Sequence, residues 1–139
     1  MFWWLVALGA VLMGLGLLVR LWPIPAERLE GHPGPYEPGW HQMEGGVKLV
    51  LPAAPKDAEA RLKKVALEDS RTVSPAPGAY VTRSAVWQFP DVTRVWRDEA
   101  GALHIHAHLV IGKGDLGVNR KRLERWLAEA GIEAGAGTS

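Results

Sequence analysis

The chain has 139 residues, with 16 basic and 15 acidic side chains and no cysteine. A net charge of +1 excludes a general nucleic-acid-binding protein, which needs a strong basic excess to displace counterions from phosphates. The lack of cysteine excludes disulfides and thiolate metal sites, and it is compatible with either side of a membrane.

Residues 1–22 are predicted to be a transmembrane anchor, which makes the lipid bilayer the first expected partner. The run from Phe2 to Val19 is apolar and uncharged. A helix of about 18 residues rises about 27 Å, close to the roughly 30 Å hydrocarbon core of a bilayer. Tryptophans stand near both ends of the run, where their rings favour the headgroup layers. A cleaved signal peptide fits less well, because its apolar region is usually shorter and follows a basic start.

The charges that flank this run predict a cytoplasmic domain. Arg20 and Arg28 follow the run, whereas no basic side chain precedes it. The positive-inside rule places the more basic flank in the cytoplasm. Glu27 and Glu30 partly offset the two arginines, so the sequence leaves the membrane side open.

Residues 23–46 are predicted to form an extended tether. Five prolines and five glycines occur in this segment, with few aliphatic side chains. Such a composition cannot bury enough apolar surface to offset the entropy of ordering the chain. Prolines also favour an extended, polyproline-like linker. His32 and His41 are interpreted as solvated residues of the tether.

Residues 47–131 are predicted to form one α+β domain, and residues 132–139 a disordered tail. Apolar side chains recur at helical or alternating spacing along the domain. The expected elements are strands at 47–51, 70–74, 80–87, 92–97 and 102–111, a helix that starts near residue 57, and a helix over 117–131. Two amphipathic helices packed on one face of a small antiparallel sheet is the economical architecture.

Two motifs are more specific than these patterns. Residues 83–91 read RSAVWQFPD, and residues 112–122 read GKGDLGVNRKR. In this order and spacing they resemble the domain of unknown function 1499 family, over about residues 47–130. The resemblance implies a small domain behind a membrane or export segment, in bacteria and plastid-bearing organisms, and hence a bacterial inner membrane. It brings no activity. The polar residues of the motifs are Arg83, Ser84, Asp91, Asp115, Asn119, Arg120 and Arg122.

His104, His106 and His108 are candidate metal ligands. Residues two apart on a strand point to the same face, about 7 Å from one another. Two imidazoles at that spacing can share a zinc ion, and a carboxylate such as Asp98 or Asp91 would have to complete the site. The alternative is a solvent-facing strand that carries polar side chains. If all three imidazoles titrate normally, they charge together below about pH 6.5 and repel one another.

The glycine-rich loop over residues 112–122 is a candidate anion site. Exposed backbone N–H groups and three basic side chains in the first helical turn would suit a phosphate or a lipid headgroup. The loop lacks the ending of a nucleotide-binding P-loop. A structural interpretation has Asp115 capping the helix or pairing with Arg120 or Arg83. Arg83 is expected to form a buried ion pair with Asp91 or Asp115.

These observations predict a membrane-tethered accessory or interaction domain with a protein partner at the membrane. No catalytic residue and no cofactor are assigned. The chain has no cysteine, and Ser84 lacks the flanking glycines of a nucleophile elbow, so no catalytic apparatus is evident. The alternative is a domain that binds a small anion or a metal, or acts on a small ligand, through the His104/His106/His108 face or the Gly112–Arg122 loop.

Overall fold

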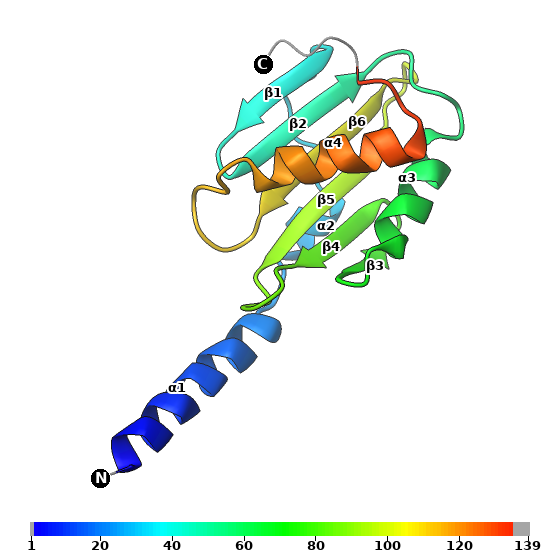
Figure 1. Cartoon of the computed structure of the whole chain (residues 1–139). Helices are drawn as coiled ribbons and strands as arrows, with labels where there is room; N and C mark the ends of the chain where they lie inside the picture. The colour runs from blue at the N-terminus through cyan, green and yellow to red at the C-terminus, as the bar shows by residue number, and fades with distance from the viewer. Residues whose placement is uncertain (1, 135–139) are drawn as a thin grey trace.

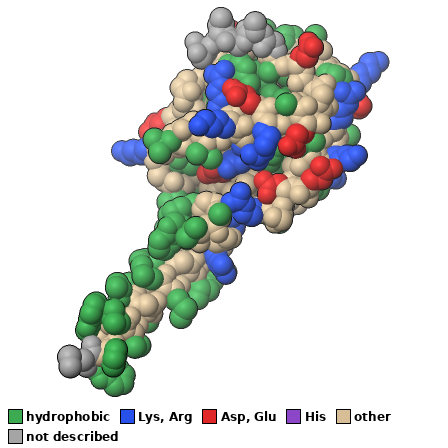
Figure 2. All heavy atoms as spheres, viewed as in Figure 1, with side chains coloured by type: hydrophobic (Ala, Val, Ile, Leu, Met, Phe, Trp, Pro, Cys, Tyr) green, Lys and Arg blue, Asp and Glu red, His purple; other side chains and the backbone are tan. Residues whose placement is uncertain are grey.

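The computed structural model describes residues 2–134, as an apolar helix followed by an α+β domain (Figure 1). Helix α1 (Trp3–Arg20) has a mean hydropathy of 1.9, and none of it is buried against the domain. Apolar side chains cover its visible face (Figure 2). By length and composition it is able to cross a membrane, and a signal sequence meets the same description.

A six-stranded antiparallel sheet forms the centre of the domain, in the order β1-β2-β6-β5-β4-β3. The strands are β1 (Gly39–Met43), β2 (Gly46–Leu51), β3 (Thr72–Ala76), β4 (Ala79–Arg83), β5 (Pro90–Arg97) and β6 (Leu103–Leu109). Ile105 on β6 lies opposite Leu49 on β2 and Val95 on β5. Because side chains alternate along a strand, this register places the apolar residues of β6 on one face and its histidines on the other.

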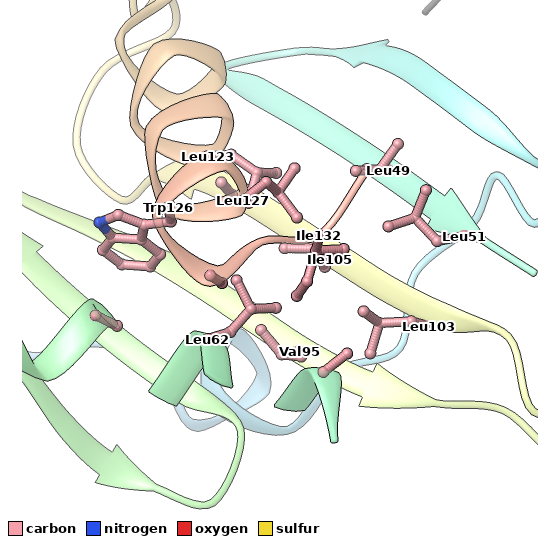
Figure 3. Close-up of a cluster of buried hydrophobic side chains, with 14 of the residues drawn as sticks. Leu49, Leu51, Leu62, Val95, Leu103, Ile105, Leu123, Trp126, Leu127 and Ile132 are labelled. Carbon is pink, nitrogen blue, oxygen red and sulfur yellow. The ribbon is translucent and has the colours of Figure 1, made fainter. Parts of the chain in front are cut away.

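Helices α3 (Ala58–Glu68) and α4 (Val118–Ala130) cover the apolar face of the sheet (Figure 1). Figure 3 shows side chains of both helices meeting those of the strands in one core. The core includes Leu62 of α3, Leu123, Trp126 and Leu127 of α4, and Leu49, Leu51, Val95, Leu103 and Ile105 of the sheet. The predicted α+β class, with two helices on one face of an antiparallel sheet, is confirmed.

Ile132 belongs to this core, although the sequence places it in a tail. Helix α4 ends at Gly131, whose φ of +68° turns the chain back toward the sheet. The Ile132 amide then donates to the Leu127 carbonyl at 2.9 Å, and the side chain of Ile132 is only 5% exposed. Ala134 also packs against the core, and residues 135–139 of the expected tail lie outside the described residues.

The strand expected over residues 80–87 ends at Arg83. Residues 84–89 turn back on themselves instead, because the Ser84 amide donates to the Phe89 carbonyl and the Phe89 amide donates to Ser84 Oγ, both at 3.0 Å. Gln88 has a φ of +62°, which a strand does not accommodate. We call residues 84–89 the 84–89 loop.

The other face of the sheet is covered by residues that the sequence assigns to a tether. Residues 26–38, which we call the strap, contain the short helix α2 (Ala26–Glu30), and this helix lies behind the sheet in Figure 1. His32 stacks on Trp96 at 5.1 Å, and Arg28 donates to the Leu109 carbonyl at 3.3 Å. Strand β1 then pairs with β2, and Trp40 is buried. The segment is ordered because it packs against side chains and backbone groups of the sheet. The composition of the segment does not reveal these contacts.

Lys48 fastens the strap to the sheet. Its side chain is fully buried, and its Nζ donates to the carbonyls of Pro33 and Pro35. The ammonium also lies 4.8 Å from the ring centre of Tyr36 and 5.1 Å from that of Trp96. Burial lowers the pKa of Lys48, while the charges of Glu37 and Asp98 raise it. Two carbonyls and two aromatic faces thus replace the water that this ammonium loses.

We expect Lys48→Met to loosen the strap and to lower the free energy of unfolding by about 1–3 kcal/mol, because two partly buried carbonyls lose their donor. Hydrogen exchange of the amides in residues 26–38 of the full chain in detergent measures the first effect, and urea unfolding measures the second. Lys63→Met on the exposed side of α3 is the matched control. Unchanged exchange of the strap in Lys48→Met would show that Lys48 does not hold it.

Candidate functional site

Four of the seven polar motif residues border one pocket between β4, β5 and α4. Arg83, Ser84, Asp91 and Arg122 line this cavity of about 290 Å³, which we call the motif pocket. The sequence predicts a pair between Arg83 and an aspartate, and this prediction is wrong, because within residues 2–134 the Arg83 guanidinium donates only to backbone carbonyls. The pair that forms joins Arg122 and Asp91, at 3.2 Å between Nη2 and Oδ2.

The Arg122–Asp91 pair is largely buried and is held by Asn119. Arg122 Nη1 donates to Asn119 Oδ1 at 2.9 Å, and the side chain of Asn119 is fully buried. Burial raises the pKa of Asp91, and the nearby Arg122 guanidinium opposes this rise. Removing one member of such a pair leaves an uncompensated charge in a poorly solvated place, so the pair fixes α4 against β5.

Arg83 and Ser84 shape the 84–89 loop and connect it to α1. Arg83 Nη1 donates to the Gln88 carbonyl at 3.0 Å and to the Val19 carbonyl of α1 at 3.2 Å. Ser84 Oγ accepts from the Phe89 amide. Both residues of the first motif thus have a local structural role at the end of the sheet from which α1 leaves (Figure 1).

Asp115 caps α4, as the structural interpretation of the second motif predicts. Its Oδ1 accepts from the Gly117 amide at 3.0 Å, and its Oδ2 accepts from the Asn119 amide at 3.1 Å. Burial alone would raise the pKa of Asp115, but the hydrogen bonds from Asn119 and Gly117 lower it overall. Asp115 does not pair with Arg120, which bonds to Glu124 and lies over the ring of Trp40, away from the motif pocket.

The motif pocket is bordered by three further basic side chains, which the sequence did not single out as a group. Arg71 directly precedes β3, and Lys121 and Arg125 lie in the first turns of α4. Figure 2 shows basic and acidic side chains mixed over this side of the domain, with basic groups close to the junction with α1. The basic run that opens α4 was the one indication of this group of cations in the sequence. Arg71 was not predictable as a member, because it reaches the pocket through the pairing of β3 with β4.

The three histidines of β6 share a face, as predicted, but most of this face is covered, and His106 is half-buried beside a cavity of about 440 Å³ under the strap. The strap supplies this cover, and His104 and His108 are buried. His104 bonds to Asp98 at 2.7 Å and stacks on Trp96. His106 and His108 stack on each other with ring centres 4.3 Å apart.

Within residues 2–134, no group of three or more His, Asp and Glu side chains is arranged to hold a metal ion. Asp98, which the sequence offers as a further ligand, is bonded to the imidazole of His104. The pKa of His106 is lowered to about 4, first by burial and then by the charges of Lys48 and Arg28. That of His108 is lowered to about 3, by burial and by its neighbours His106 and Arg28. These two imidazoles are therefore neutral at pH 6.5, and the expected joint charging there does not occur.

The fold and the motif pocket define a small α+β domain that follows an apolar helix. The chain belongs to the family described as Protein of unknown function (DUF1499), whose family model matches residues 43–129. This match confirms the resemblance that the two motifs carry. Neither a curated protein nor a solved structure matches the chain. Helix α1 and the strap precede the matched region.

We expect the domain to lose stability between pH 7.5 and pH 5, by roughly 2 kcal/mol for each of His106 and His108. The unfolded chain protonates each imidazole below its ordinary pKa of 6.5, whereas the folded chain keeps them neutral down to about pH 4 and about pH 3. Acid therefore favours the unfolded state. The folded state reaches its full stability only above pH 6.5, where the imidazoles of the unfolded chain are neutral too.

Urea unfolding of the full chain in detergent at a series of pH values measures this loss. The variant His108→Gln removes one of the two groups and should reduce the slope by about half between pH 6 and pH 5. The carboxylates of Asp98 and Asp115 have lowered pKa values and act at lower pH. An equally steep curve in His108→Gln would contradict the assignment.

Proposed function

We propose that α1 anchors the chain in a membrane as a single span, and that the domain binds a phosphate-bearing ligand at the surface of that membrane. The observation that carries this proposal is the unbalanced positive charge around the motif pocket. Arg83 lines the pocket and also bonds to the end of α1, so the proposed ligand site lies next to the proposed anchor.

Three cations at the motif pocket have no acidic partner. Arg71, Arg83 and Lys121 form no ion pair with a carboxylate in the part of the chain that the structure describes. The two acidic residues of the pocket, Asp69 and Asp91, face other arginines. A cavity of about 290 Å³ with three uncompensated cations suits a phosphate group, because guanidinium and ammonium donors match its oxygens.

The position of the pocket favours a ligand at the membrane surface. Arg83 bonds to the carbonyl of Val19, one residue before the end of α1. If α1 spans a bilayer, the last turn of the helix lies near the headgroups, and so does the pocket. The ligand is then the phosphate of a lipid headgroup or of a molecule in solution. Arg20 and Arg28 favour the cytoplasmic side of a bacterial inner membrane.

The proposal is for binding and not for catalysis. Ser84 Oγ bonds to the Phe89 amide and makes no hydrogen bond to a histidine or carboxylate within residues 2–134. A protein partner at the membrane stays a prediction. A long flexible tether would allow the domain to reach such a partner. The ordered strap shortens the flexible part of this segment and so reduces the reach of the domain.

The full chain in nanodiscs of phosphatidylcholine, with its melting temperature as the readout, tests this function. One arm adds inorganic phosphate, and the other replaces part of the lipid with phosphatidylglycerol. A ligand at about 100 times its Kd adds about 2.7 kcal/mol, so we expect a rise of roughly 10 °C in one arm for a domain of this size. The arm that responds tells whether the phosphate comes from solution or from a lipid.

Lys121→Gln should abolish most of the rise, because it removes a cation without an ion pair from the pocket. Lys63→Gln, on the exposed side of α3, is the matched control and should keep the rise. No rise in either arm would overturn the proposal, and so would an equal rise in both variants.

A further inference from the structure

The 84–89 loop exposes large apolar side chains at the end of the domain where α1 leaves. Val86 is 79% exposed, Trp87 45% and Phe89 41%. Residues 84–90 contain no charged side chain. Trp87 lies at the surface and not in the core. Three neighbouring apolar side chains in water carry a cost that a partner surface would remove.

The loop is held in a fixed shape despite its exposure. Ser84 and Phe89 close it with two hydrogen bonds, and Arg83 bonds to the Gln88 carbonyl at 3.0 Å. Gln88 Nε2 donates to the Ala85 carbonyl at 3.4 Å. Several of its polar backbone groups are thus satisfied within the loop, as a segment in an apolar medium requires.

The loop lies beside α1 rather than above its end. Val86 and Trp87 share a cavity of about 290 Å³ with residues of the last two turns of α1, including Met13 and Leu17. Met13 is seven residues before Arg20, the last residue of α1. At 1.5 Å per residue, this places the level of Met13 about 10 Å below the end of the helix.

We infer that the 84–89 loop inserts into the same bilayer as α1, with Val86 and Trp87 among the lipid acyl chains. This rests on the proposed anchoring of α1. The cavity that Val86 and Trp87 share with α1 extends from Met13, which a spanning helix places in the hydrocarbon core, to Arg20 at the headgroup level, so the loop lies within the depth of the bilayer. A depth of about 5–10 Å is typical of interfacial apolar segments, and tryptophan favours this region. Arg20 and Arg83 at the base of the loop suit the headgroup level.

The insertion gives the domain a second contact with the membrane. A single helix allows the domain to rotate and tilt above the bilayer, whereas a helix and an inserted loop fix its orientation. The motif pocket, which shares Arg83 and Ser84 with the base of the loop, then faces the headgroups at a defined height. The first motif thus contains the apolar 84–89 loop together with Arg83 and Ser84, the two side chains that hold the loop in shape.

Fluorescence quenching tests the insertion directly, since the chain has no cysteine and a single one introduces a clean label site. Three variants of the full chain, Val86→Cys, Met13→Cys and Ala100→Cys, are labelled with bimane and reconstituted in phosphatidylcholine vesicles. Some vesicles contain lipids with a nitroxide on the acyl chain. Met13 reports on the anchor, and the exposed Ala100 lies in the turn between β5 and β6 at the far end of the sheet.

We expect the nitroxide lipids to reduce the emission at positions 86 and 13 at least twofold, and to leave position 100 almost unchanged. If position 13 is quenched and position 86 behaves like position 100, the inference is overturned while the anchor stands. If position 13 is not quenched either, α1 does not span the bilayer, and both the inference and the proposed anchoring fail.

Discussion

The buried ammonium of Lys48 is the interaction on which the arrangement of the whole chain depends. It donates to the carbonyls of Pro33 and Pro35 and lies close to the rings of Tyr36 and Trp96, so it joins the strap to β2 of the sheet. Helices α3 and α4 cover only one face of that sheet. The other face carries the histidines of β6 and needs a cover, which the strap supplies. Because the strap begins a few residues after α1, fixing it leaves only residues 21–25 as a connection between α1 and the strap.

Arg83 completes this arrangement from the other direction. Its guanidinium connects the carbonyl of Val19 in α1 with that of Gln88 in the 84–89 loop, and it borders the motif pocket. The same side chain therefore contacts an apolar loop, the end of α1 and a basic cavity. A domain held in this way does not search for partners at the end of a long linker. If α1 anchors the chain as proposed, the domain presents one surface to the membrane, the end of the sheet with the motif pocket.

Local patterns made much of the fold predictable from the sequence. The alternation from Leu103 to Leu109 separates the core face of β6 from its histidine face, and the helical spacing of Leu123, Trp126 and Leu127 gives the buried side of α4. The strap was not predictable, because its order comes from contacts with Lys48 and Trp96, which are distant in the sequence. The aromatic and β-branched residues near 86 resemble a strand, and only the hydrogen bonds between Ser84 and Phe89 show a loop. The sequence could not show which arginine pairs with Asp91, since Arg83 and Arg122 carry the same guanidinium group.

The central claim is that α1 and the domain form one rigid unit. Double electron–electron resonance on the full chain in nanodiscs, with nitroxides at Leu8→Cys in α1 and Ala100→Cys at the far end of the sheet, measures the distance between them. A strap held by Lys48 and a helix end held by Arg83 predict a single narrow distance distribution. A broad distribution, as a flexible linker over residues 23–38 would produce, would contradict the account.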